Sequence, residues 1–171
     1  MELSWMGRYR PLIRAIVRNR NLFARAVNTK TENTGGDTSL TIQEWIVLEY
    51  VIENEDKEDS MVYIAERLGL APSSFSKITH ALCKSGLLAK YQMVGNKKNI
   101  IVRPTEEGRR FYLEHSAQLE KTIFQEFFKE LEGLSDEDLA CVERAIGKMD
   151  TGLCEEAPRS ESGDSQLIRI E

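Results

Sequence analysis

The chain has 171 residues, of which 41% are apolar and 30% charged, with a net charge of −5; this composition is typical of a globular domain with its own hydrophobic core. It contains no apolar run of the roughly 20 residues that a membrane span requires, and its first residues lack the features of a signal peptide. Its three cysteines form no C-x-x-C pair and it has two histidines, so we expect a cytoplasmic protein without a disulfide framework, metal or cofactor.

The first predicted element is an amphipathic helix over residues 10–27, followed by a polar, glycine-containing loop at 28–39. The apolar stripe of this helix consists of Ile13, Ile16, Val17, Phe23, Ala24 and Val27. The next helix begins at a capping box, in which Glu44 follows Thr41 by three residues. It ends in the acidic run at 54–59.

Two short helices joined by a tight turn follow. The first runs from about Ser60 to Leu68 and stops at Gly69, because glycine tolerates the left-handed conformation of a helix end. Pro72 suits the first turn of the second helix, which runs to about Ser85. Two helices connected by a short turn that contains glycine are typical of a helix-turn-helix.

The remaining elements are two strands and two further helices. Residues 87–93 and 99–103 carry the strand signals, and a basic turn separates them. Thr105 caps a long predicted helix from 106 to about 131. A last helix begins at Ser135 and repeats apolar residues at a spacing typical of a helix–helix seam. That seam consists of Leu139, Val142, Ile146 and Met149.

The second helix of the helix-turn-helix has two contrasting faces. Its expected core face consists of Phe75, Ile78, Thr79 and Leu82. The opposite face and its flanks carry hydroxyls and cations, which are Ser73, Ser74, Ser76, Lys77, His80 and Lys84. No acidic residue occurs between Ala71 and Lys90. Such a face suits a helix that enters the major groove of DNA, although a basic solvated face is the alternative.

The charge is unevenly distributed along the chain. The net charges are +6 for residues 1–30, −8 for 31–71, +6 for 72–110, −5 for 111–149 and −4 for 150–171. Blocks of this size suggest surfaces with separate electrostatic roles, so the acidic total does not exclude double-stranded DNA as a partner. The turn between the strands adds Asn96, Lys97 and Lys98 to the second basic block, where they can contact phosphate or the minor groove.

Three segments resemble the MarR family of winged-helix transcriptional regulators. They are residues 64–70 (IAERLGL), 82–88 (LCKSGLL) and 102–108 (VRPTEEG). The resemblance covers about residues 10–149 and implies a homodimeric repressor that binds a pseudo-palindromic operator. The family's wing usually carries an Asp and, two residues later, an Arg, where this chain has Asn96 and Lys98. The ion pair of such a wing therefore cannot form here.

The expected fold class is mainly α with a small β-hairpin wing. The expected parts are an N-terminal dimerisation helix and loop (1–39), a winged helix-turn-helix domain (40–105, with the helix-turn-helix at about 60–84 and the wing at 87–104), C-terminal dimerisation helices (106–149) and a disordered acidic tail (150–171). Apolar residues of the long helix also favour a dimer, although they can pack within one chain. They are Phe111, Leu119, Ile123, Phe124, Phe127, Phe128 and Leu131.

Family members commonly sense a small molecule between the dimerisation helices and the winged domain. The candidate contacts for a small aromatic or anionic effector, which packing of the core or the helix surface also explains, are Trp5, Tyr9, Arg14, Arg18 and Trp45. We expect Cys83, beside the helix-turn-helix, to be a half-buried structural thiol.

The sequence therefore predicts a sequence-specific DNA-binding regulator. The alternative is a winged-helix module for protein–protein assembly, which would more often place apolar or mixed-charge residues on the basic helix face. The sequence shows no nucleophile–base pair, phosphate-binding loop or metal-ligand spacing, so no catalytic residue is assigned and an enzyme is not expected.

Overall fold

The computed structural model describes residues 4–26, 39–93, 96–150 and 167–170. The predicted loop at 28–39, apart from Ser39, and residues 151–166 of the predicted tail lie outside these ranges. The chain divides into two compact units, Met1–Ile46 and Val47–Glu171, with the boundary inside one helix.

The first unit is built from helices. A short 3-10 helix, η1 (Ser4–Tyr9), leads into α1 (Arg10–Ala26), which confirms the amphipathic helix expected at 10–27. The next helix, α2 (Ile42–Glu53), starts at the predicted capping box. There the Thr41 amide donates to the Glu44 carboxylate at 2.7 Å, and the Glu44 amide donates to the Thr41 hydroxyl at 3.2 Å. Two otherwise unsatisfied amides of the helix start thus have partners.

The second unit contains the helix-turn-helix, formed by α3 (Met61–Arg67) and α4 (Pro72–Lys84). The hydroxyl of Ser60 caps α3 by accepting from the Tyr63 amide at 3.2 Å. Gly69 turns the chain at φ +63°, and the next amide, that of Leu70, donates to the Ala65 carbonyl at 2.8 Å. This geometry is a Schellman motif, which a residue with a Cβ would strain.

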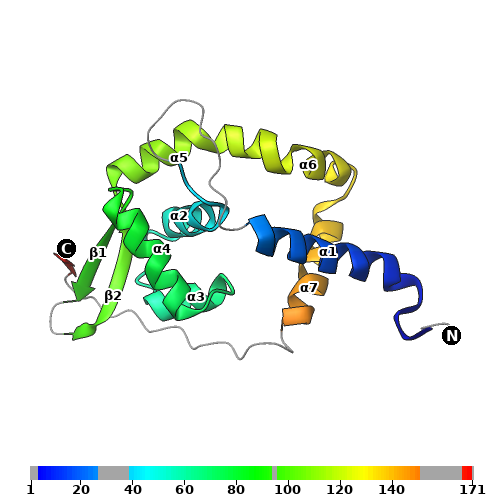
Figure 1. The fold of residues 1–171 in the computed structure, drawn as a ribbon, viewed down its shortest axis with the longest axis horizontal. Coiled ribbons are helices and arrows are strands. Elements are labelled where there is room, and N and C mark those ends of the chain that lie inside the picture. Colours follow the sequence, from blue (N-terminus) through cyan, green and yellow to red (C-terminus); the bar gives the residue numbers. More distant parts are fainter. Residues whose placement is uncertain (1–3, 27–38, 94–95, 151–166, 171) are drawn as a thin grey trace. The chain divides into compact units, whose positions relative to one another are not determined.

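The wing consists of β1 (Leu88–Met93) and β2 (Asn96–Pro104), which pair antiparallel from Leu88 opposite Pro104 to Met93 opposite Asn96 (Figure 1). The second strand is longer than the predicted 99–103, because residues 96–98 belong to it rather than to the turn. Polar residues in an exposed hairpin strand resemble a turn in the sequence, which explains the error.

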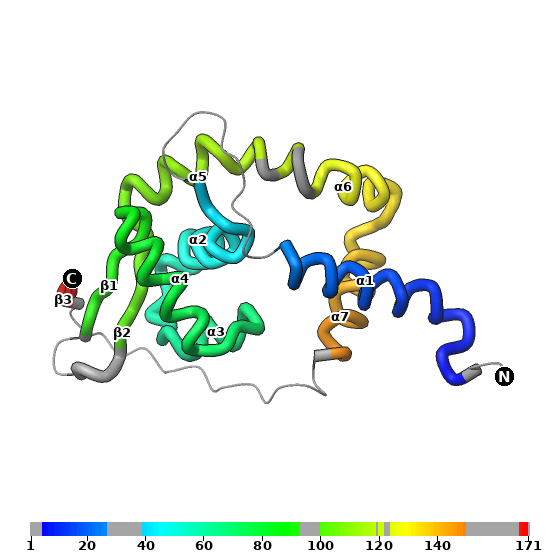
Figure 2. Tube along the Cα trace, viewed as in Figure 1, coloured from blue at the N-terminus to red at the C-terminus, as the bar shows by residue number. Residues whose placement is uncertain are grey.

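A third strand, β3 (Leu167–Ile170), pairs antiparallel with the other edge of β1, so the strand order is β2-β1-β3 (Figure 2). The prediction of a disordered tail is therefore wrong for these four residues. The polar composition of the tail as a whole concealed a short apolar segment, and the open edge of β1 supplies the hydrogen-bonding partners that this segment lacks alone.

The core of the second unit lies between α2, the helix-turn-helix and the sheet. The expected core face of α4 is confirmed, because Phe75, Thr79 and Leu82 are each 0% exposed, while Ile78 is half-buried. The Thr79 hydroxyl donates to the Phe75 carbonyl at 3.0 Å, so this buried polar group is satisfied. The other buried core residues are Leu48, Val51, Ile64, Ala65, Leu87, Leu88, Ile101, Val102 and Phe111.

The long helix predicted at 106–131 is α5 (Glu106–Leu119), a π-helical turn η2 (Glu120–Phe124) and α6 (Gln125–Leu131), which continue one another in Figure 1. The last helix, α7 (Asp136–Asp150), starts at Ser135, whose hydroxyl accepts from the Asp138 amide at 3.2 Å. This confirms the predicted start of the last helix.

Candidate nucleic-acid interface

Helix α4 presents the predicted polar face to solvent. The six side chains of that face, Ser73, Ser74, Ser76, Lys77, His80 and Lys84, are all exposed. They are fixed in this orientation because Phe75, Thr79 and Leu82 on the other side of the helix are fully buried in the core. The structure thus brings all six together on one helix.

The N-terminus of α4 also faces solvent. Ala71 occupies the N-cap position without a side-chain hydrogen bond, and Pro72 forms the first turn. No acidic residue lies in that turn. The partial positive charge of the helix start is thus available to an anion such as a phosphate, next to the hydroxyls of Ser73 and Ser74.

The cations of α4 are not neutralised within the chain. Lys77 and Lys84 make no ion pair with any residue that the structure describes. Ion pairs do occur elsewhere in the second unit, as between Arg109 of α5 and Glu55 at 2.6 Å and between Lys129 and Glu126 of α6 at 2.7 Å. The exposed face of α4 therefore carries an uncompensated positive charge, as a surface that binds a polyanion requires.

The wing is anchored at its base. The Arg103 guanidinium on β2 donates to the Lys57 carbonyl at 2.7 Å, and Ser60 pairs with Ile101 in an isolated bridge. The backbone of Asn96, Lys97 and Lys98 belongs to β2, whereas their side chains lie outside the described part of the molecule. The contacts of these three residues with DNA therefore stay predictions.

The start of α5 is attached to the turn that follows α4. The Thr105 hydroxyl donates to the Gly86 carbonyl at 2.6 Å and accepts from the Gly108 amide at 3.0 Å, and the Thr105 amide donates to the Leu87 carbonyl at 3.0 Å. Gly108 is buried against the same carbonyl. These contacts join the start of α5 directly to the turn that ends α4.

A second connection joins α5 to α2. The Tyr112 hydroxyl donates to the Glu49 carboxylate, and the Arg109 guanidinium donates to Glu55 from two nitrogens, at 2.9 and 2.6 Å. Burial, reinforced by the neighbouring carboxylate, raises the pKa of Tyr112 to about 12. The Tyr112 hydroxyl therefore stays protonated and remains a donor at neutral pH.

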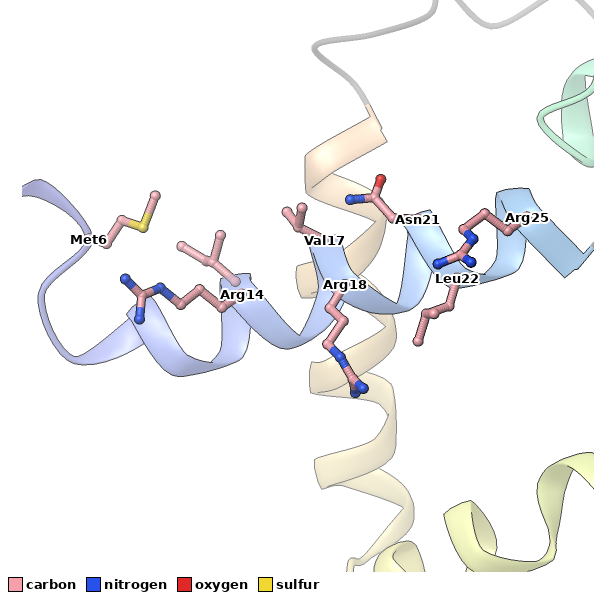
Figure 3. Close-up of a pocket in the computed structure, with 8 residues that line it drawn as sticks. Met6, Arg14, Val17, Arg18, Asn21, Leu22 and Arg25 are labelled. Carbon is pink, nitrogen blue, oxygen red and sulfur yellow. The ribbon is translucent and has the colours of Figure 1, made fainter.

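Only some of the candidate effector residues lie together. Arg14 and Arg18 line an exposed groove of about 460 Å³ along α1, beside Met6, Val17 and Leu22 (Figure 3). The three aromatic candidates do not line it: Trp5 and Tyr9 are exposed and Trp45 is 2% exposed. Helical spacing in the sequence predicts that Arg14 and Arg18 share one face of α1. It could not predict where the 3-10 helix η1 places Trp5 and Tyr9.

The thiol of Cys83 is half-buried, and burial raises its pKa, although Lys90 and Arg169 lower it in part. A thiol with a raised pKa is a poor nucleophile at neutral pH, in keeping with the structural thiol that we expected. Lys90 and Arg169 were not among the predicted site residues. The sequence signal for a strand at 167–170 was its three β-favouring apolar residues within the polar tail.

Within the described ranges, no helix is long and apolar enough to cross a membrane. In the same ranges, no three His, Cys, Asp or Glu side chains gather into a metal site.

Comparison with known proteins gives a family match for the helix-turn-helix region. The model of the MarR family matches residues 38–92, which span α2, α3, α4 and most of β1. The HTH-type transcriptional regulator PchR of Bacillus subtilis (strain 168) is 28% identical over 90 residues, 53% of this chain and 53% of PchR. The uncharacterized HTH-type transcriptional regulator YhjH of the same organism is 26% identical over 135 residues, 79% of this chain and 75% of YhjH. The chain thus spans about half the length of PchR and three quarters of YhjH.

Solved structures match over most of the chain. The transcriptional regulator BldR from Sulfolobus solfataricus has a TM-score of 0.59 at 16% identity and covers 84% of this chain and 99% of its own. FabT of Streptococcus pneumoniae, solved in complex with DNA, has a TM-score of 0.53 at 15% identity and covers 85% of this chain and 96% of its own. At these identities the likeness establishes the fold, which is a winged helix.

Proposed function

Because residues 38–92 belong to the MarR family of transcriptional regulators, we propose that this chain is a DNA-binding repressor that reads a pseudo-palindromic operator as a homodimer. The observation that carries the proposal is the exposed face of α4, with hydroxyls, His80 and two lysines that have no ion-pair partner among the described residues. These groups are of the kind that meets base edges and phosphates in the major groove. The structure of FabT with DNA supports the same use of the fold.

A homodimer accounts for the apolar surface that the single chain leaves exposed. On α7, Val142, Ile146 and Met149 are 46%, 47% and 45% exposed, and on α6 Phe127 is 57% exposed. The structure gives α1 no buried residue, although its apolar stripe is well formed. A second copy can cover these surfaces, and a two-fold dimer then presents two α4 helices to two half-sites.

The dimer also matches the charge distribution. Residues 1–30 carry a net +6 and residues 111–149 a net −5, so the N-terminal helix of one copy and the C-terminal helices of another are complementary. The arginines along α1 remain candidates for an anionic effector with an apolar body, because the groove of Arg14 and Arg18 combines both kinds of lining. Release of the operator by such an effector is part of the proposal.

The assembly alternative is less well supported. A helix that docks on another protein generally presents apolar side chains at the centre of its interface, whereas the exposed face of α4 holds serines, lysines and a histidine. Nothing in that face favours protein–protein assembly over DNA.

We expect Lys77 to read bases and the wing lysines to contact phosphate. Replacing Lys77 by Ala should weaken binding to the best duplex from a selection by roughly 1–3 kcal/mol per half-site, with a smaller loss on scrambled DNA. Replacing Lys97 and Lys98 by Ala should weaken both duplexes by similar factors. It should also reduce the slope of log K against log salt by about 1 for each lost phosphate contact.

The measurement is a titration of each variant against both duplexes at several salt concentrations. Lys57→Ala is the control, because Lys57 is an exposed lysine that belongs neither to α4 nor to the wing strands, and its ammonium donates to the Asn54 side chain. It should bind both duplexes as the unaltered chain does. If the wing variant lost discrimination and the Lys77 variant lost only general affinity, the two roles would be reversed. If the unaltered chain bound no duplex, the proposed function would be wrong.

A further inference from the structure

The C-terminal strand β3 places a cation, Arg169, beside α4. Strand β3 pairs with β1 so that Arg169 lies opposite Tyr91 and Ile170 lies opposite Lys90. An open hollow of about 760 Å³ lies between α4 and the two strands, and Arg169 lines it together with Lys90 of β1 and with His80 and Lys84 of α4. Cations from three separate elements thus line one space.

The charge of this hollow has no acidic counterpart among the residues that the structure describes. None of the residues that line it is acidic, and Lys84, Lys90 and Arg169 make no ion pair with any described residue. Lys90 and Arg169 both lower the pKa of the Cys83 thiol, which lines the same hollow, so each charge acts on that thiol. A hollow lined by charges of one sign attracts anions, and a polyanion most strongly.

We propose that this hollow binds phosphate groups, and that β3 is a functional third strand of the wing sheet that supplies Arg169 to them. The inference rests on the proposed function, because we expect the phosphate to come from the backbone of the duplex that α4 binds. His80 and Lys84 belong both to the exposed face of α4 and to the hollow, so a duplex on that face brings phosphates close to Arg169.

The chemistry favours phosphate over a single carboxylate. A guanidinium donates two parallel hydrogen bonds to a phosphate, and the lysine ammonium groups add charge without a strict geometry. Three permanent cations exceed the single charge of a carboxylate, whereas successive phosphates of a nucleic acid or a polyphosphate match them.

The test compares two tail variants that each remove one positive charge. Arg169→Gln removes a cation that lines the hollow, and Arg159→Gln removes the other arginine of residues 150–171, which lies outside the described residues. We expect Arg169→Gln to weaken duplex binding roughly threefold to tenfold and to reduce the slope of log K against log salt by about 1 per subunit. Arg159→Gln should leave the slope unchanged. A chain that ends at residue 166 should behave like Arg169→Gln.

The source of the phosphate is tested separately with tripolyphosphate. NMR spectra of the full chain should show saturable shifts of the Lys84, Lys90 and Arg169 amides in the unaltered chain and in Arg159→Gln; in Arg169→Gln the shifts of Lys84 and Lys90 should be lost. If these shifts occurred while the salt slope did not depend on Arg169, the hollow would bind a free phosphate compound rather than DNA.

The absence of both effects would overturn the proposal. So would tighter duplex binding by the chain that ends at residue 166, because β3 would then obstruct the DNA. If the unaltered chain bound no duplex, the proposed function would fail, and the tripolyphosphate titration alone would decide whether the hollow is a phosphate site.

Discussion

Replacing Gly108 by Ala is expected to lower the free energy of unfolding by about 3 kcal/mol, at the upper end of the usual cost of overpacking. A Cβ at this position would lie 2.1 Å from the carbonyl oxygen of Leu87 and 3.0 Å from its carbonyl carbon. These are backbone atoms, so α5 must move as a whole. That movement would also disturb the Thr105 hydrogen bonds to Gly86 and Leu87. Urea unfolding at a fixed protein concentration measures the loss.

Gly133→Ala is the matched control, because an added Cβ there meets no atom within 4 Å. It should change the free energy of unfolding by less than about 0.5 kcal/mol. Because α5 begins at the turn that ends α4, Gly108→Ala should also weaken duplex binding under conditions in which the variant is fully folded. Equal stability of the two variants would show that the attachment of α5 to the Leu87 carbonyl is looser than described.

Replacing Ile146 by Asp is expected to convert the proposed dimer into monomers. Ile146 is 47% exposed in the single chain and lies at the centre of the seam on α7. If that seam is covered by a second copy, each of two symmetric contacts loses about 2 kcal/mol or more, which weakens association by roughly 1,000-fold. Operator affinity should fall as well, because a monomer holds a single half-site. Sedimentation at several concentrations measures the association.

Arg144→Gln serves as the control, since it changes the net charge by the same amount on the other side of α7 and Arg144 is exposed. It should remain dimeric and bind the operator as the unaltered chain does. An Ile146→Asp variant that stayed dimeric would place the interface elsewhere. A compact, stable monomer of the unaltered chain at micromolar concentration would contradict the dimer altogether.

Local signals made most of the fold predictable. The capping box of Thr41 and Glu44, the turn at Gly69 and the cap at Thr105 each depend on hydrogen bonds within a few residues, so the sequence contains all the partners. The buried and exposed faces of α4 were predictable for the same reason, since helical periodicity places Phe75 and Lys77 on different sides.

The features that the sequence did not reveal depend on distant partners or on weak local signals. Strand β3 pairs with β1, from which more than seventy residues separate it, so a four-residue segment with three apolar residues in a polar tail carried little information. The π-helical turn at Glu120–Phe124 interrupts the expected long helix without a proline or glycine to mark it. Trp45 lies in the buried core, but its residue type alone is equally compatible with the wall of a ligand pocket.

The central claim is that α4 reads DNA sequence as part of a two-fold dimer, and selection of bound duplexes from a random pool with the purified full chain tests it most directly. We expect an enriched motif with two-fold symmetry, whose half-sites lie about one helical turn apart, and whose enrichment Lys77→Ala diminishes. Recovery of no common sequence, or of a motif that lacks two-fold symmetry and does not change with Lys77→Ala, would contradict it.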